Sequence, residues 1–142
     1  MRTTFLKSAE IEQDWYHVDG AGQILGRLSV KIANVLMGKH KPTYASYVDT
    51  GDFVVVTNVG KLKITGNKLE QNEYARYSGY CGGYKTTPMS EVFEERPERV
   101  LHASVRRMLP KNALGRRMLK KLKMYREDAH PHAAQQPKEW SF

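Results

Sequence analysis

The stretch FVVVTN, residues Phe53–Asn58, decides the fold. It opens with four apolar residues, three of them β-branched, and shows no alternation between apolar and polar positions. Such a run is typical of a strand that is buried on both faces, as in a parallel sheet. Working outward, DWYHVDG (residues 14–20) predicts a short strand that ends in a turn, and ILGRLSVKIANVLMG (residues 24–38) predicts the helix between the two strands.

The helical segment carries its apolar residues on one stripe, opposite Arg27, Lys31 and Asn34, and Gly38 is a plausible C-terminal stop. The apolar stripe consists of Leu25, Leu28, Ile32, Val35 and Leu36. Strand, helix and second strand form a βαβ unit. We therefore expect an α/β fold: a single domain with helices on both faces of a small, mostly parallel sheet.

The remaining segments of the 142-residue chain predict further helices, a short strand and loops within the same single domain. SEVFEER (residues 90–96) and PERVLHASVRRML (residues 97–109) predict two short helices, and KLKIT (residues 61–65) predicts another short strand. The stretches 38–52 and 66–85 are loop-like. We expect an N-terminal arm over residues 1–13 and an extended C-terminal tail over residues 127–142, either disordered alone or docked on a neighbour.

Positive charge is concentrated in one segment. The net charge is +8, but residues 99–126 contain ten Lys/Arg and no Asp/Glu, so this segment carries +10 and the rest of the chain −2. Concentrated charge of one sign costs self-repulsion and is typical of proteins that bind a polyanion. A surface that serves only solubility usually intersperses both signs, and this one does not.

The basic segment also contains a break, within VRRMLPKNALGRRMLKKLK (residues 105–123). A residue before proline avoids helical angles, so Pro110 predicts that the first helix ends near Met108. Asn112 can cap a second helix. That helix turns Leu114, Met118, Leu119 and Leu122 inward and Arg116, Arg117, Lys120 and Lys121 largely outward. With Gly115 as a second helix breaker, the basic residues lie on a bent surface. A bent surface suits the irregular backbone of folded RNA, whereas a straight basic helix suits a straight groove. A DNA-binding module remains the alternative.

The sequence offers little for catalysis or metal binding. Gly20, Gly22 and Gly26 form G-x-G-x-x-x-G, whose spacing differs from the dinucleotide fingerprint, and no acidic residue follows at the required distance. A nucleotide-dependent enzyme using this turn is the competing hypothesis. Cys81 has no evident activating base, and His130 and His132 lack further ligands at zinc-like spacing. We expect no catalytic residue, no metal, no cofactor and no small-molecule substrate.

The cellular compartment follows from three observations. Cys81 is the only cysteine, which excludes an intrachain disulfide and fits a reducing compartment. No stretch approaches the roughly 20 apolar residues of a membrane span. The first 15 residues include three acidic residues and no apolar core of a signal peptide. We expect a cytoplasmic protein with no membrane partner.

Six motifs extend the basic signature along the chain. Together with the basic signature they closely resemble the large-subunit ribosomal protein 13 family, bacterial type. The basic signature is VRRMLPKNALGRRMLKKLKMY, and the six motifs are DWYHVDGAGQILGRLSVKIANVLMGKHKPTY, VDTGDFVVVTN, ITGNK, GGYK, RPERV and the tail HPHAAQQP. The resemblance implies a three-layer α/β/α domain with a parallel sheet of four strands. It further implies a structural constituent of the large ribosomal subunit that binds large-subunit (23S-type) rRNA and supports early assembly beside neighbouring ribosomal proteins.

Candidate RNA-binding residues combine positive charge, tyrosines in loop-like stretches and glycine-rich loops; ordinary surface tyrosine and core packing are the alternative for about half of the tyrosines. Tyrosine can stack on a base, Lys and Arg can meet phosphate, and glycine lets backbone approach a phosphate closely. The candidates are Lys39, His40, Lys41, Tyr44, Lys68, Arg76, Tyr77, Gly82, Gly83, Lys85, Arg106, Arg107, Lys111, Arg116, Arg117, Lys120, Lys121 and Lys123.

Overall fold

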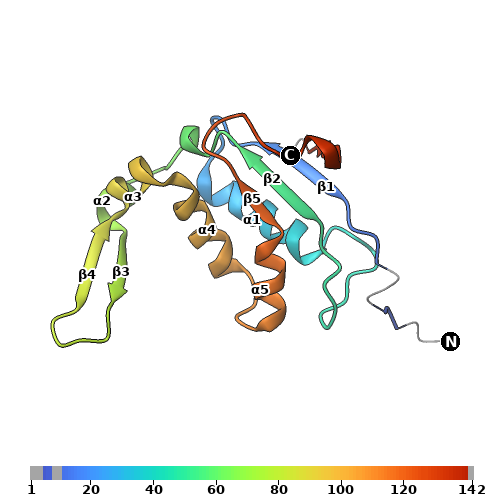
Figure 1. Ribbon diagram of the computed structural model, residues 1–142, viewed down its shortest axis with the longest axis horizontal. Coiled ribbons are helices and arrows are strands. Elements are labelled where there is room, and N and C mark those ends of the chain that lie inside the picture. The colour runs from blue at the N-terminus through green and yellow to red at the C-terminus, as the bar shows by residue number, and fades with distance from the viewer. Residues whose placement is uncertain (1–4, 8–10, 141–142) are drawn as a thin grey trace.

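A computed structural model describes residues 5–7 and 11–140 (Figure 1). The arm expected over residues 1–13 lies partly outside this range, and its described residues have no regular secondary structure. The elements are β1 (Trp15–Asp19), α1 (Leu25–Met37), β2 (Phe53–Thr57), η2 (Val59–Lys61), α2 (Lys68–Gln71), β3 (Glu73–Tyr77), β4 (Tyr84–Pro88), α3 (Met89–Glu95), α4 (Pro97–Met108), α5 (Ala113–Lys120), β5 (Leu122–Met124), η3 (Ala133–Gln135) and β6 (Lys138–Glu139).

The main sheet has four strands in the order β5-β2-β1-β6, and every neighbouring pair is parallel. In the central pair Trp15 lies beside Phe53 and Asp19 beside Thr57. All residues of β2 after Phe53 are buried. The expected βαβ unit and the doubly buried strand are therefore confirmed, as is Gly38 as the helix stop, since its φ of 80° is left-handed.

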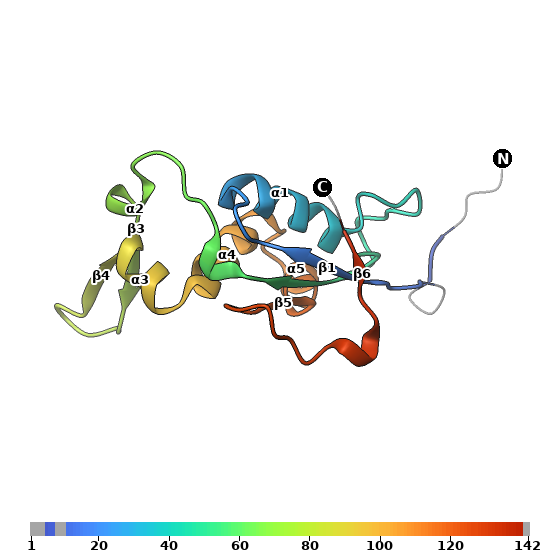
Figure 2. The same ribbon diagram turned by 90° about the horizontal axis from the view of Figure 1, so that it is seen from above.

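The two faces of the sheet are covered differently. Val18, Val54 and Val56 point into a core shared with the apolar faces of α1 and α4. On the other face the Trp15 ring stacks on Phe53 with centroids 4.4 Å apart, under the segment of residues 125–137 that includes η3. Figure 2 shows α1 on one side of the sheet and this segment on the other. The α/β domain with a four-stranded parallel sheet is confirmed.

The C-terminal tail does not behave as we expected. It packs on the domain's own sheet: β6 pairs with β1, and the Trp140 backbone N–H donates to the His17 carbonyl at 2.9 Å. The Trp140 ring meets Tyr16 edge-on with centroids 4.3 Å apart. A strand of two residues has no sequence periodicity, and its pairing partner lies more than 120 positions away, which explains why the pattern did not reveal it.

Two further expectations are wrong. Residues 66–85 are not a loop, because they contain α2 and β3, and β3 pairs with β4 in an antiparallel hairpin that extends away from the main sheet (Figure 1). Residues 61–65 do not form a strand. They begin with the last residue of η2 and make a single bridge between Lys63 and Ile24. The hairpin lacks a buried face, so the apolar alternation that marks most strands is missing.

The break in the basic segment lies where Pro110 predicts it. Helix α4 ends at Met108, and the side chain of Asn112 accepts a hydrogen bond from the Gly115 backbone N–H at 2.8 Å. Gly115 itself is no breaker, because it lies buried inside α5. A Cβ atom there would lie 1.9 Å from the Pro110 carbonyl oxygen. Gly115 thus allows α5 to begin directly against the turn.

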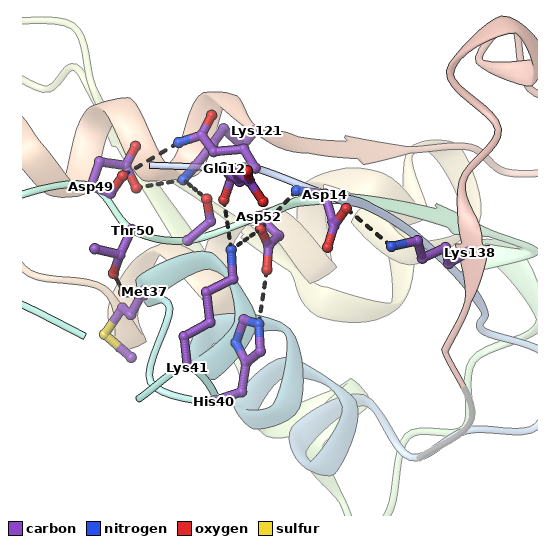
Figure 3. A network of polar contacts seen from close by, with 12 residues as sticks. Glu12, Asp14, Met37, His40, Lys41, Asp49, Thr50, Asp52, Lys121 and Lys138 are labelled. Carbon is purple, nitrogen blue, oxygen red and sulfur yellow. Dashed lines mark hydrogen bonds and ion pairs between the residues drawn. The ribbon is translucent and has the colours of Figure 1, made fainter. Parts of the chain in front are cut away.

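A network of polar contacts fastens the 38–52 loop to the sheet (Figure 3). The Asp52 side chain is fully buried, and its Oδ1 accepts from the Asp14 backbone N–H at 2.9 Å and from the Lys41 ammonium. The His40 Nε2 lies 2.8 Å from the Asp52 Oδ2. Lys41 also donates to the Glu12 carbonyl oxygen at 2.9 Å. Both basic residues therefore face inward.

Lys121 belongs to the same network, which corrects our expectation that it points outward. It is only 5% exposed, it pairs with the Asp49 carboxylate, and it donates to the Gly51 carbonyl oxygen at 2.8 Å. Burial lowers the pKa of the Lys121 ammonium, and its hydrogen bond and charge interaction with Asp49 oppose that change. Lys121 therefore joins the start of β5 to the loop that precedes β2.

Replacing Lys121 by Met should lower the free energy of unfolding by about 1–3 kcal/mol, since the Asp49 carboxylate and the Gly51 carbonyl lose a charged donor. The neighbouring Lys120 is exposed, so Lys120→Met is the matched control and should change stability by less than about 0.5 kcal/mol. Chemical denaturation of both variants measures the difference. Equal stabilities would contradict a structural role for Lys121.

Replacing Gly115 by Ala should destabilise the domain by about 1–3 kcal/mol, because the new methyl group overpacks against Pro110. Glycine to alanine normally stabilises a helix, so the sign of the effect is diagnostic. Gly26 in α1 has no atom within 4 Å of the position that a Cβ would occupy, and Gly26→Ala should leave stability unchanged or raise it by up to about 1 kcal/mol. Thermal unfolding that shows both variants stabilised would refute the close contact.

Candidate nucleic-acid interface

A groove of about 530 Å³ lies between α4, α5 and the turn that joins them. Its walls carry basic side chains and no Asp or Glu. The basic residues are Arg99, Arg106, Arg107, Lys111 and Arg116. All five are exposed, and no carboxylate of the described residues forms an ion pair with any of them. The bend at Pro110 places cations on both walls of one concave surface.

The helical repeat of α4 explains how its cations face the groove. Val100, Leu101 and Val105 are buried in the core. Arg99 and Arg106, seven positions apart, lie on another side of the helix and line the groove. The same periodicity that buries the apolar stripe therefore presents the basic stripe to the groove.

The pKa values of two titratable groups in the groove are shifted by their surroundings. Burial lowers the pKa of His102, and the positive charge of Arg106 lowers it further. Burial raises the pKa of the Tyr74 phenol, and the charges of Arg107 and Arg99 oppose that rise. Burial and the nearby positive charge thus both disfavour protonation of His102, and the same positive charge favours an anion in the groove.

The chemistry of this groove is that of phosphate binding. A guanidinium group donates two parallel hydrogen bonds to a phosphate and keeps its charge at every physiological pH. Several such groups in one concavity, without a neutralising carboxylate, focus a positive potential there. Among the described residues that line the groove there is no Ser, Thr, Cys, Asp or Glu.

The hairpin holds a second group of the sequence-derived candidates. Arg76 and Lys85 lie opposite each other on β3 and β4. With Ser78 and Gly83 they line a hollow of about 280 Å³. Tyr77 is 64% exposed on the adjacent position.

The 38–52 loop lies at the opposite end of the molecule from the hairpin in both ribbon views (Figures 1 and 2). Lys39 and Tyr44 are exposed there. His40 and Lys41 contact Asp52 instead of projecting freely. Only part of this loop is therefore free to contact RNA.

The structure brings some candidates together and separates others. Lys68 lines a small depression together with Arg107, close to the groove. Arg117 and Lys120 are exposed on α5. Lys121 is buried, and Lys123 lies half-buried on β5 beside Val55, on the sheet face turned away from α1 and α4. Gly82 has a left-handed φ of 72° in the hairpin turn.

Our candidate set omitted three groove residues: Arg99, His102 and Tyr74. The helical spacing of Arg99, His102 and Arg106 was visible in the sequence and could have identified the first two. Tyr74 needed the hairpin, which the sequence pattern did not reveal. Among the described residues, no cluster of three His, Cys, Asp or Glu side chains is arranged to hold a metal ion. No helix in the same part of the chain has the length and apolar character needed to cross a membrane.

Comparison with known proteins agrees with this geometry. The model of the family described as Ribosomal protein L13 matches residues 13–131. The chain is 52% identical to Large ribosomal subunit protein uL13 of Thermotoga petrophila over 96% of the chain and 91% of that protein. It is 51% identical to the protein of that name from Chloroflexus aggregans, over 97% and 96% of the two chains. It is 47% identical to the one from Moorella thermoacetica, over 100% and 99%. The chain belongs to the ribosomal protein L13 family.

Proposed function

We propose that this protein is a structural constituent of the large ribosomal subunit, where it binds large-subunit rRNA, contacts neighbouring ribosomal proteins and supports early subunit assembly. The observation that carries the proposal is the carboxylate-free groove between α4 and α5 in a chain of this family. The relatives are named for the large ribosomal subunit. The role is structural, and no reaction is assigned to the groove.

The groove suits the backbone of folded RNA. Cations on α4 and on α5 approach a bound strand from two directions, so they can contact phosphates that are not in a straight line. Sequence readout is not needed for such contacts, because phosphate contacts position a protein without specifying bases. Specificity then comes from the shape of the folded rRNA.

The remaining candidates divide by their surroundings. We assign RNA contacts to the exposed residues Lys39, Tyr44, Lys68, Arg117 and Lys120, in addition to the groove and the hairpin. We assign a supporting role to the three basic residues whose side chains contact Asp52 or Asp49. These three residues are His40, Lys41 and Lys121.

The direct test is sedimentation of cell extract through a sucrose gradient, with the protein detected in each fraction. We expect it with the large ribosomal subunit and with large-subunit assembly intermediates. A protein found wholly in the ribosome-free fractions would refute the proposal.

Neutralising the groove should reduce the salt dependence of rRNA binding. Each lost phosphate contact lowers the slope of log K against log salt concentration by roughly 0.7–0.9, so Arg106→Gln with Arg116→Gln should lower it by about 1.4–1.8. The matched control, Arg27→Gln with Lys63→Gln, removes the same charge at exposed positions outside the groove and should keep the wild-type slope. Equal slopes for both double variants would mean that binding follows net charge alone.

Binding should also take up a proton at His102. Burial and the positive charge of Arg106 both lower the pKa of His102 in the free protein. A phosphate beside Arg106 offsets the second of these causes, so that pKa is higher in the complex than in the free protein. The complex then binds more protons, and affinity rises as pH falls through the interval between the bound and free pKa values, by up to about tenfold for each unit between them. The control is His102→Gln, which retains every other histidine. Affinities measured between pH 7.5 and 5.5 should show a weaker pH dependence for this variant, and identical pH profiles would contradict the linkage.

A further inference from the structure

The β3–β4 hairpin has two unlike faces, because successive side chains of a strand point to opposite sides. Arg76 lies opposite Lys85 on one face, and Tyr77 lies opposite Tyr84 on the other. Both tyrosines are 64% exposed. The hairpin extends away from the main sheet (Figure 1), and most residues of its two strands are exposed.

The two cations of this face, Arg76 and Lys85, have no carboxylate partner among the described residues. Like charges directly opposite each other in an antiparallel pair, as these two are, are destabilising. The hollow between them also depends on a glycine. A Cβ at Gly83 would lie 2.0 Å from the Ser78 Oγ, so a larger residue would displace the side chain that lines the hollow.

The cationic face continues into the groove between α4 and α5. Tyr74 precedes Arg76 by two positions and therefore lies on the same face of β3. It also lines the groove beside Arg99 and Arg107. One RNA backbone can thus follow a basic surface from the groove to the hairpin.

The aromatic face offers two rings with no partner ring among the described residues. Tyr80 lies between the two strands of the hairpin and is 79% exposed. Tyrosine stacks on any base that has left its helix, since every base has a π face. In a duplex the bases are stacked on each other and their faces are not available.

We propose that the hairpin binds an unpaired stretch of RNA, with phosphates against Arg76 and Lys85 and bases stacked on Tyr77 and Tyr84. This inference rests on the proposed function, which gives RNA as the partner. It adds that the RNA is unpaired, that one face of the hairpin binds its phosphates and that the other face binds its bases. RNA is favoured over a protein partner because one RNA strand carries both complementary groups: phosphates for the cationic hollow on one face and unpaired bases for the open rings on the other.

The test uses the full chain and two probes: a 16-nucleotide RNA of mixed A and C, which cannot pair with itself, and the duplex with its complement. Tyr77→Val with Tyr84→Val keeps β propensity and should weaken single-strand binding by about 5- to 150-fold for each lost stack. Its salt slope and its duplex affinity should match those of the wild type. Tyr77→Phe with Tyr84→Phe keeps both rings and should bind like the wild type. Arg76→Gln with Lys85→Gln should instead lower the single-strand salt slope by about 1.4.

Three outcomes would overturn the inference. In the first, the valine variant binds the single strand within twofold of the wild-type affinity. In the second, the valine variant loses duplex affinity by the same factor as single-strand affinity. In the third, the wild type does not bind the single strand. Unchanged RNA affinity with failed incorporation into the large subunit would mean that the rings bind a protein. None of the three overturning outcomes changes co-sedimentation of the wild-type protein or the salt dependence of the groove, so failure here is distinguishable from failure of the proposed function. Thermal unfolding of each variant verifies that the domain remains folded.

Discussion

The Asp52 carboxylate is fully buried at the start of the central strand, and much of the structure is arranged to stabilise that charge. A buried carboxylate is costly unless donors surround it. The donors come from the residue before β1 and from the loop after α1, so satisfying one side chain fixes both segments against β2. Lys121 extends the same arrangement to β5 through Asp49 and the Gly51 carbonyl. Strands β1, β2 and β5 are thus joined at one end by hydrogen bonds and ionic contacts, and the Lys138–Asp14 ion pair joins β6 to the residue before β1.

The same chemistry divides the basic residues into two groups. Lys41 and Lys121 face carboxylates and are used to build the domain. The cations of the groove face no carboxylate of the described residues, and their mutual repulsion is relieved when an anion binds. This difference decides which lysines and arginines contact RNA in our proposal, and it follows from neighbouring side chains that are distant in sequence. The net charge and the local density of basic residues in the sequence do not distinguish the two groups.

The sequence predicted the parts of the fold that have strong local signals. The valine run of β2, the apolar stripe of α1 and the proline and asparagine around residues 110–112 each determine a conformation through nearby residues. The hairpin and β6 were not predicted, because exposed or very short strands lack an alternating pattern. Among the candidate site residues, Arg106, Lys111 and Arg116 were found together in the groove. Lys121 was misplaced because its partners Asp49 and Gly51 lie about 70 positions away.

The pairing of β6 with β1 also sets an order of events during synthesis. The β1–α1–β2 unit and the basic helices are complete in the chain by residue 120, whereas the edge of β1 stays uncovered until residues 138–139 have emerged. At about 5–20 residues per second, roughly 4–16 s separate the emergence of β2 from that of β6. During that interval both walls of the groove between α4 and α5 have been synthesised, and the last strand of the sheet has not. The edge of β1 is therefore the last part of the sheet to gain its pairing partner from the growing chain.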